Sequence, residues 1–174
     1  PRGVPVVINK EYYEADVKIL TGSITPHQSA GFSGGRKSVL PGIAGKVALR
    51  SHHSYPLRVQ GPAMGVLSDN HFSEEAMAAA RMAGVDFILN VVQNGRKQIV
   101  RAVAGDVESA WLDGVARARE IFEVRAPQMK PDLVISFTGG PPRDINLYQA
   151  QKSISPAEKI VRAGGMIIVV AECA

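Results

Sequence analysis

Cysteine is nearly absent from this chain, since Cys173 is the only one among its 174 residues. A single cysteine excludes an internal disulfide framework and a multi-cysteine metal site, and it fits a reducing compartment. No apolar run reaches the ~18 residues that a membrane span requires, and no signal-peptide pattern is present. We therefore expect a cytoplasmic protein that has no membrane partner.

An excess of charge of one sign is also missing. The 20 basic and 16 acidic residues give a formal net charge of +4, without a long run of either sign. Nucleic-acid-binding proteins usually concentrate basic charge on one stripe or patch. The nearest cluster, Arg96-Lys97 with Arg101, is more typical of a solvated strand edge. We expect no nucleic-acid partner.

Metal-ligand spacings are missing as well, because neither H-x-x-x-H nor C-x-x-C occurs. The four histidines are His27, His52, His53 and His71. If residues 44–55 are helical, His52 and His53 point about 100° apart and cannot easily chelate one metal together. Any metal would need further ligands from a cofactor, from another segment or from a part of the protein outside this chain.

The composition is that of a globular protein, with 45% hydrophobic and 21% charged residues. Apolar runs typical of strands alternate with segments of helical spacing. The predicted strands are Asp16–Gly22, Asp86–Val92, Lys97–Gly105, Pro131–Gly140 and Met166–Val170. The predicted helices begin with caps at Ser73 and Asp106 and with the capping box Ser155–Glu158. This alternation predicts an α/β fold with a mainly parallel, Rossmann-like sheet and helices on both faces.

One aromatic residue and the two chain ends call for interpretation. Trp111 lies in an apolar stripe at helical spacing, which favours core packing over a stacking platform for a ligand.

The chain opens at Pro1 without an initiator methionine, and it stops at Ala174 directly after an apolar run. We therefore expect a piece of a larger protein.

The segment Thr25–Gly42 gathers four glycines, two prolines, His27 and the pair Arg36-Lys37. A P-loop reads G-x-x-x-x-G-K-[ST], but Arg36 stands where the second glycine belongs, and G-x-G-x-x-G fails too. The glycines and the two cations could still bind an anion. A structural glycine turn with exposed basic residues is the alternative. His27 follows a predicted strand, where catalytic groups often lie.

A second polar cluster follows the paired glycines Gly139-Gly140. Tyr148, Gln149 and Lys152 at positions i, i+1 and i+4 could share the start of a helix. Lysine supplies charge, and glutamine and tyrosine supply hydrogen bonds, so this set suits a small carboxylate. A solvated amphipathic helix start explains the same residues equally well.

Together these segments resemble the nickel-dependent lactate racemases. The resembling motifs, in the family's order, are TPHQSAGFSGGRKSVLPGIAG, the following histidine pair, RMAGVDFILNVV, DINLYQAQK and GGMIIVVAEC. The resemblance implies a two-domain α/β enzyme. This chain then holds the later, cofactor-anchoring part of the first domain in residues 1–126 and the start of the second in residues 127–174, truncated at both ends. The proline-containing segment Arg125–Pro131 is the linker candidate.

The resemblance also implies a cofactor, the nickel pincer nucleotide, which is a nickel-carrying pyridinium-3,5-bisthiocarboxylic acid mononucleotide. It is attached covalently to the lysine of GGRKS, here Lys37. His53 then completes the coordination of nickel, with His52 as the second candidate. Imidazole and sulfur ligands suit nickel, and in a chain with one cysteine the sulfurs come from the cofactor. Dedicated maturation proteins are implied as partners.

In the implied reaction His27 is one of two opposed acid/base histidines. It exchanges the hydroxyl proton of a 2-hydroxy acid while the Cα hydride moves to the cofactor. Gln149 and Lys152 fall where the family binds the substrate carboxylate, and Tyr148 borders the same pocket. The second histidine belongs to a missing N-terminal part, so we expect the isolated chain to be inactive. Ser29 replaces a frequent aromatic residue, which favours a larger or more polar substrate than lactate.

Two other functions stay open at this point. The chain could be a non-catalytic α/β module that binds a nucleotide or anion through its glycine-rich loop. It could also belong to an enzyme of related architecture that uses the loop for phosphate without nickel. A covalent adduct on Lys37 with stoichiometric nickel would distinguish the racemase from both.

Overall fold

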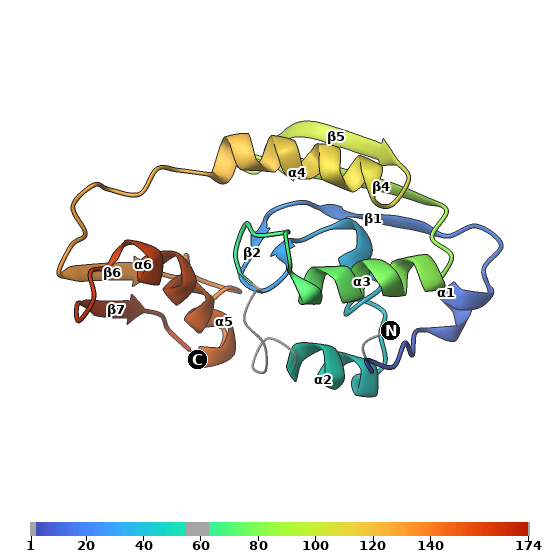
Figure 1. The fold of residues 1–174 in the computed structure, drawn as a ribbon, viewed down its shortest axis with the longest axis horizontal. Helices are drawn as coiled ribbons and strands as arrows, with labels where there is room; N and C mark the ends of the chain where they lie inside the picture. Colours follow the sequence, from blue (N-terminus) through green and yellow to red (C-terminus); the bar gives the residue numbers. More distant parts are fainter. Residues whose placement is uncertain (1–2, 55–62, 174) are drawn as a thin grey trace. The chain divides into compact units, whose positions relative to one another are not determined.

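The computed structural model describes residues 3–54 and 63–173, which form an α/β structure of two compact units, Pro1–Glu123 and Val124–Ala174 (Figure 1). The first unit contains a sheet of strand order β1-β4-β5 and a two-stranded hairpin, β2-β3. The strands of this sheet are β1 (Ile19–Ser23), β4 (Phe87–Gln93) and β5 (Ile99–Gly105). The helices of the first unit are α1 (Lys10–Glu14), α2 (Lys46–Ser54), α3 (His71–Met82) and α4 (Ser109–Phe122). The α/β prediction is confirmed.

The sheet of the first unit is mixed rather than mainly parallel. Strand β1 runs parallel to β4, with Leu20 opposite Ile88, whereas β5 runs antiparallel to β4. The reversal follows from a tight turn, in which Asn94 Oδ1 accepts hydrogen bonds from the N–H groups of Arg96 and Gln98. Because this turn is short, β5 must pair with β4 as a hairpin.

Burial alternates along β4 and shows which face of the sheet carries the core. Ile88 and Val92 are buried on one face, while Phe87 and Leu89 point to the other face and are largely exposed. Helix α4 packs against β4 and β5 (Figure 1). Trp111 of α4 is buried, as the apolar stripe predicted. Within the described residues, helices therefore cover the core face, and apolar side chains stay exposed on the opposite face.

The starts of α3 and α4 differ from the sequence prediction by up to one turn. Ser73 lies inside α3, and Asn70 caps this helix by accepting the N–H of Ser73. Helix α4 begins at Ser109, with Glu108 at the cap position, and the carboxylate of the predicted cap Asp106 accepts the N–H groups of Glu108 and Ser109. The hydrogen bonds from Ser109 are the main reason that the pKa of Asp106 is lowered.

The second unit pairs two parallel strands around a short helical crossover. Its elements are β6 (Leu133–Phe137), α5 (Leu147–Ala150), the 3₁₀ helix η3 (Gln151–Ser153), α6 (Ile154–Ile160) and β7 (Met166–Val170). The predicted capping box at Ser155 is wrong, because η3 continues directly into α6 and Ser155 lies inside the helix. Pro156 is tolerated there, since the first turn of a helix has N–H groups without intrahelical partners.

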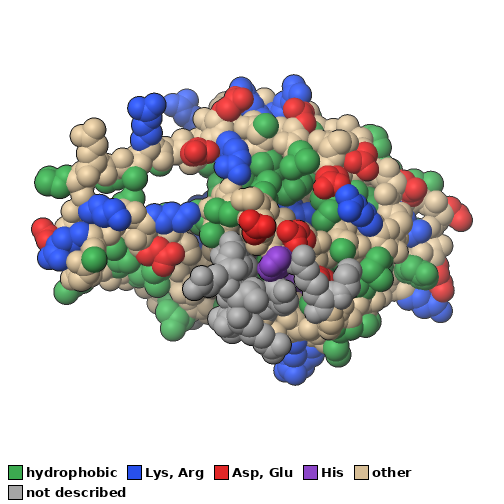
Figure 2. Space-filling model, viewed as in Figure 1, with side chains coloured by type: hydrophobic (Ala, Val, Ile, Leu, Met, Phe, Trp, Pro, Cys, Tyr) green, Lys and Arg blue, Asp and Glu red, His purple; other side chains and the backbone are tan. Residues whose placement is uncertain are grey.

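Basic and acidic side chains are interspersed on the face drawn in Figure 2. Most of the ion pairs are between exposed side chains, such as Arg101 with Asp113 at 2.9 Å. Among the described residues, no helix has the length and apolar character needed to cross a membrane.

Candidate functional site

The glycine-rich segment forms a hairpin and a turn that are fixed to the central strand of the sheet. The hairpin consists of β2 (Pro26–His27) and β3 (Gly31–Phe32), and the 3₁₀ helix η1 (Gly35–Ser38) follows it. Asn90 of β4 accepts the N–H of Gly35 at 2.8 Å. Gly34 has a φ of 77°, and a Cβ atom there would lie 2.6 Å from Asn90 Oδ1. Only glycine allows the chain to approach the strand this closely.

The guanidinium of Arg36 is buried beneath this segment. Its Nη2 donates hydrogen bonds to Ala30 O at 2.9 Å and to Ser73 Oγ at 2.7 Å. Its Cζ atom lies over the Trp111 ring, 3.6 Å from the ring centre. Burial lowers the pKa of Arg36 to about 9, so the side chain is still a cation at neutral pH. Arg36, one of the two cations proposed to bind an anion at this loop, therefore points into the core.

The second cation, Lys37, contacts the histidine of the hairpin. Lys37 Nζ lies 2.9 Å from His27 Nε2. The other ring nitrogen, Nδ1, accepts the N–H groups of Ser29 at 3.2 Å and Ala30 at 3.1 Å. The fold therefore joins the predicted acid/base residue and the predicted anchor residue directly.

The paired histidines of α2 have different environments, as their helical spacing predicted. His52 is completely buried, and its Nε2 donates a hydrogen bond to Phe72 O at 2.9 Å. His53 is half-buried, and its Nδ1 donates to Leu49 O at 3.1 Å. Phe72 links the group: its ring stacks on His52 at 3.7 Å and lies 5.5 Å from the ring of His53 and 6.4 Å from that of His27.

Burial lowers the pKa of His52 to about 4, which makes the stability of the protein dependent on pH. Neutral His52 stabilises the fold above the unfolded pKa of about 6.5, and this contribution is lost as the pH falls toward 4. We expect the free energy of unfolding to fall by on the order of 3 kcal/mol across this range. Urea unfolding at a series of pH values measures it. His52→Phe should flatten the profile, whereas an equally steep profile in this variant would contradict the assignment.

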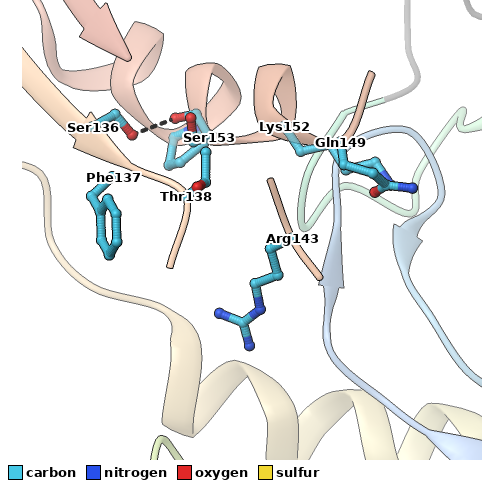
Figure 3. A pocket seen from close by; sticks show the side chains of 8 residues that line it. Ser136, Phe137, Thr138, Arg143, Gln149, Lys152 and Ser153 are labelled. Atoms are coloured by element: carbon cyan, nitrogen blue, oxygen red, sulfur yellow. Dashed lines mark hydrogen bonds between the residues drawn. The ribbon is translucent and has the colours of Figure 1, made fainter. Parts of the chain in front are cut away.

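Two of the carboxylate-binding candidates of the second unit, Gln149 and Lys152, line a cavity of about 400 Å³ (Figure 3). Lys152 Nζ donates a hydrogen bond to Gln149 Oε1 at 2.7 Å and lies 5.4 Å from the centre of the Tyr148 ring. Burial lowers the pKa of Lys152. Arg143 lines the same cavity and adds a second cation. The three predicted residues therefore lie together, with Gln149 and Lys152 on the cavity wall.

Sequence reasoning missed the contributions of Phe72, Asn90 and Arg143. Asn90 carried a usable signal, because it is the one polar residue in the apolar run Phe87–Val92. A buried polar side chain in a strand usually serves a hydrogen bond. Phe72 carried no such signal, since an isolated aromatic residue at a helix start is ordinary core material.

The described residues offer no complete metal site of their own. Across residues 3–54 and 63–173, no three His, Cys, Asp or Glu side chains gather closely enough to hold a metal ion. His53 supplies one imidazole, and the proton on Nδ1 leaves the lone pair of the neutral ring on Nε2. This donor set suits a metal that brings its other ligands with a cofactor.

Two family models match the chain. The model described as lactate racemase N-terminal domain matches residues 1–65, and the model described as lactate racemase C-terminal domain matches residues 126–174. A lactate racemase of Thermoanaerobacterium thermosaccharolyticum is 44% identical over 100% of this chain and 41% of its own length. A lactate racemase of Lactiplantibacillus plantarum is 42% identical over 98% of this chain and 40% of its own length. The chain thus spans about two fifths of these curated relatives.

Solved structures agree with this similarity. The lactate racemase apoprotein of Thermoanaerobacterium thermosaccharolyticum superposes with a TM-score of 0.87 at 43% identity, over 95% of this chain and 40% of that one. A crystal structure of a protein from Thermotoga maritima has a TM-score of 0.62 at 22% identity, over 79% of this chain and 36% of that one. The latter likeness concerns the fold alone.

Proposed function

We propose, from the premise that this chain belongs to the lactate racemase family, that it is part of an enzyme that racemises a 2-hydroxy acid. The observation that carries the proposal is the 2.9 Å contact between Lys37 and His27. It joins a lysine that can anchor a cofactor to a histidine that can exchange a proton. An anion-binding module is less favoured, because Arg36 is buried and Lys37 is engaged by a histidine.

The proposed cofactor is the nickel pincer nucleotide. Lys37 would hold it covalently, and His53 would supply one nitrogen ligand to the nickel through Nε2. His53 suits this role better than His52, because His52 is completely buried and its Nε2 donates to Phe72 O. When bound, the cofactor supplies an acceptor for the hydride of the substrate Cα. The maturation proteins that make it are proposed partners.

His27 is the proposed acid/base residue of this chain. To take the hydroxyl proton at Nε2, the ring must present a lone pair there and carry its own proton on Nδ1. At present Nδ1 accepts two backbone N–H groups, which hold the opposite tautomer. Proton exchange with substrate therefore requires the ring to give up these two contacts.

Substrate binding is assigned to the second unit. Lys152 would pair with the substrate carboxylate, with Gln149 and Tyr148 as hydrogen-bonding neighbours. A carboxylate would have to displace the present hydrogen bond between Lys152 and Gln149, which holds the ammonium in place until substrate arrives. A charge-assisted hydrogen bond to a carboxylate is stronger than one to a neutral amide, so the exchange is favourable. Arg143 in the same cavity is compatible with a substrate more polar than lactate.

Cofactor loading tests the proposal. We expect the full-length protein, co-expressed with the maturation proteins, to carry a covalent adduct on Lys37 and stoichiometric nickel. Lys37→Arg keeps the charge but removes the nucleophilic amine, so this variant should lose both the adduct and the nickel. Intact mass and metal analysis measure the two quantities. Lys46→Arg, on the exposed start of α2, is the matched control. An unmodified wild-type protein that retains free nucleotides would favour the binding module instead.

A further inference from the structure

Two cations line the cavity of the second unit, and the other described residues of its wall are neutral. The cations are Lys152 and Arg143. Lys152 Nζ donates a hydrogen bond to Gln149 Oε1, which is an uncharged amide oxygen. Within residues 3–54 and 63–173 the guanidinium of Arg143 has neither a hydrogen bond nor an ion pair. The cavity therefore holds two positive charges that no carboxylate of the described wall balances.

The turn after β6 brings Arg143 to this cavity. Arg143 N donates a hydrogen bond to Gly140 O at 2.9 Å, so the chain reverses directly after the strand. The side chain lies against Gly139, where a Cβ atom would be 3.2 Å from Arg143 Nη1. Gly139 also has a φ of 92°, which other residues rarely adopt. The guanidinium is thus placed at the carboxyl end of a parallel strand, where α/β sheets usually bind ligands.

The two cations belong to separate parts of the cavity wall. Figure 3 shows Lys152 beside Gln149 on a helical segment, whereas Arg143 extends from another segment with its guanidinium directed away from them. A carboxylate paired with Lys152 therefore leaves Arg143 available for a different anionic group.

The size of the cavity fits a substrate longer than lactate. Its volume of about 400 Å³ lies in the range of roughly 300–1,000 Å³ that is typical of sites for much larger ligands. A three-carbon acid held at Lys152 would fill only a part of this volume. The unfilled part can take a side chain that carries a second polar group.

We propose that Arg143 binds a second carboxylate of the substrate, so that the substrate is a 2-hydroxy dicarboxylic acid. The inference rests on the proposed function for the place of the first carboxylate at Lys152. A guanidinium can donate two parallel hydrogen bonds to one carboxylate. It balances one negative charge, which suits a carboxylate better than a phosphate group with a charge of about −1.5 to −2. Lactate has no second anionic group and gains nothing from Arg143.

The test compares malate, 2-hydroxyglutarate and lactate as substrates of the full-length protein, co-expressed with the maturation proteins. We expect kcat/KM for at least one dicarboxylic acid to exceed that for lactate by about tenfold or more, as the loss or gain of a charge-assisted hydrogen bond predicts. Arg143→Gln should lower this ratio by a similar factor, mainly through KM. Arg143→Lys should restore part of it, because an ammonium keeps the charge but lacks the planar fork. Arg125→Gln, at an exposed position, is the matched control and should keep the ratio.

Three kinetic results would overturn the inference. They are a higher kcat/KM for lactate than for both dicarboxylic acids, an unchanged ratio in Arg143→Gln, and an equal fall in Arg125→Gln.

Binding measurements on the same preparations separate this inference from the proposed function. Succinate and propionate match malate and lactate but lack the hydroxyl group, and calorimetry gives their affinities. Tighter binding of succinate that is lost in Arg143→Gln would uphold the second carboxylate site even in a protein that racemises none of the acids, and that protein would remove the proposed function alone. Equal affinities for the two acids would refute the inference and leave racemisation of lactate intact.

Discussion

The variant His27→Gln is expected to lower the racemisation rate of the cofactor-loaded, full-length protein by about 10²–10⁴-fold, the usual contribution of a general acid/base group. The glutamine amide keeps hydrogen-bonding atoms but cannot exchange a proton near neutral pH. Because His27 also contacts Lys37, the rate must be divided by the nickel bound in each preparation. This normalisation separates a defect in the chemistry from a defect in loading.

The matched control is His71→Gln, which changes a histidine that pairs with Glu74 at the start of α3. It should racemise at the wild-type rate per bound nickel. If His27→Gln did the same, His27 would not be an acid/base residue of this reaction. A fall in nickel content with an unchanged rate per nickel would assign His27 to cofactor attachment alone.

The second large effect concerns Arg36, whose replacement by methionine should lower the free energy of unfolding by about 3 kcal/mol or more. The guanidinium is completely buried, donates to Ala30 O and Ser73 Oγ, and stacks on Trp111. Methionine fills similar space but leaves these acceptors without a partner. Arg36 connects the hairpin that carries His27, the first turn of α3 and helix α4, so its loss loosens all three.

Urea unfolding of the full-length protein measures this effect. Arg36→Lys should recover only part of the loss, because an ammonium lacks the planar fork that reaches several acceptors and stacks on a ring. Arg96→Met, at the exposed turn between β4 and β5, is the control and should change stability little. A loss no larger than that of the control would mean that Arg36 is not the link between these elements.

The two units carry different parts of the proposed chemistry. The first unit holds the proposed anchor Lys37, the proposed acid/base residue His27 and the nickel-ligand candidate His53. Lys37 contacts His27, and the rings of both histidines lie near that of Phe72. The second holds a cavity with Gln149 and Lys152. In the proposed function the residues for cofactor and for substrate therefore come from separate segments of the chain.

The sequence singled out residues that the structure brings into contact, but it predicted the architecture less well. His27, Lys37 and the set of Tyr148, Gln149 and Lys152 could be chosen because each stands in a long, unusual motif. The antiparallel return of β5 was not predicted, because it depends on one turn at Asn94–Gln98 whose side-chain hydrogen bonds have no periodic signature. The start of α6 was predicted wrongly for a similar reason, since a preceding 3₁₀ turn overrode a good local capping pattern.

The sequence by itself determined the α/β class, the family and the residue types from which a site could be built, because these depend on local pattern and on motif order. Only the tertiary structure decided what each side chain does. It buried Arg36, placed His52 in the core and left His53 half-exposed, and set His27 against Lys37. The protonation state, tautomer and orientation of these side chains depend on partners that are far apart in the chain. Examples are Asn90 with Gly35 and Phe72 with His52. Such partners come together only when the chain has folded.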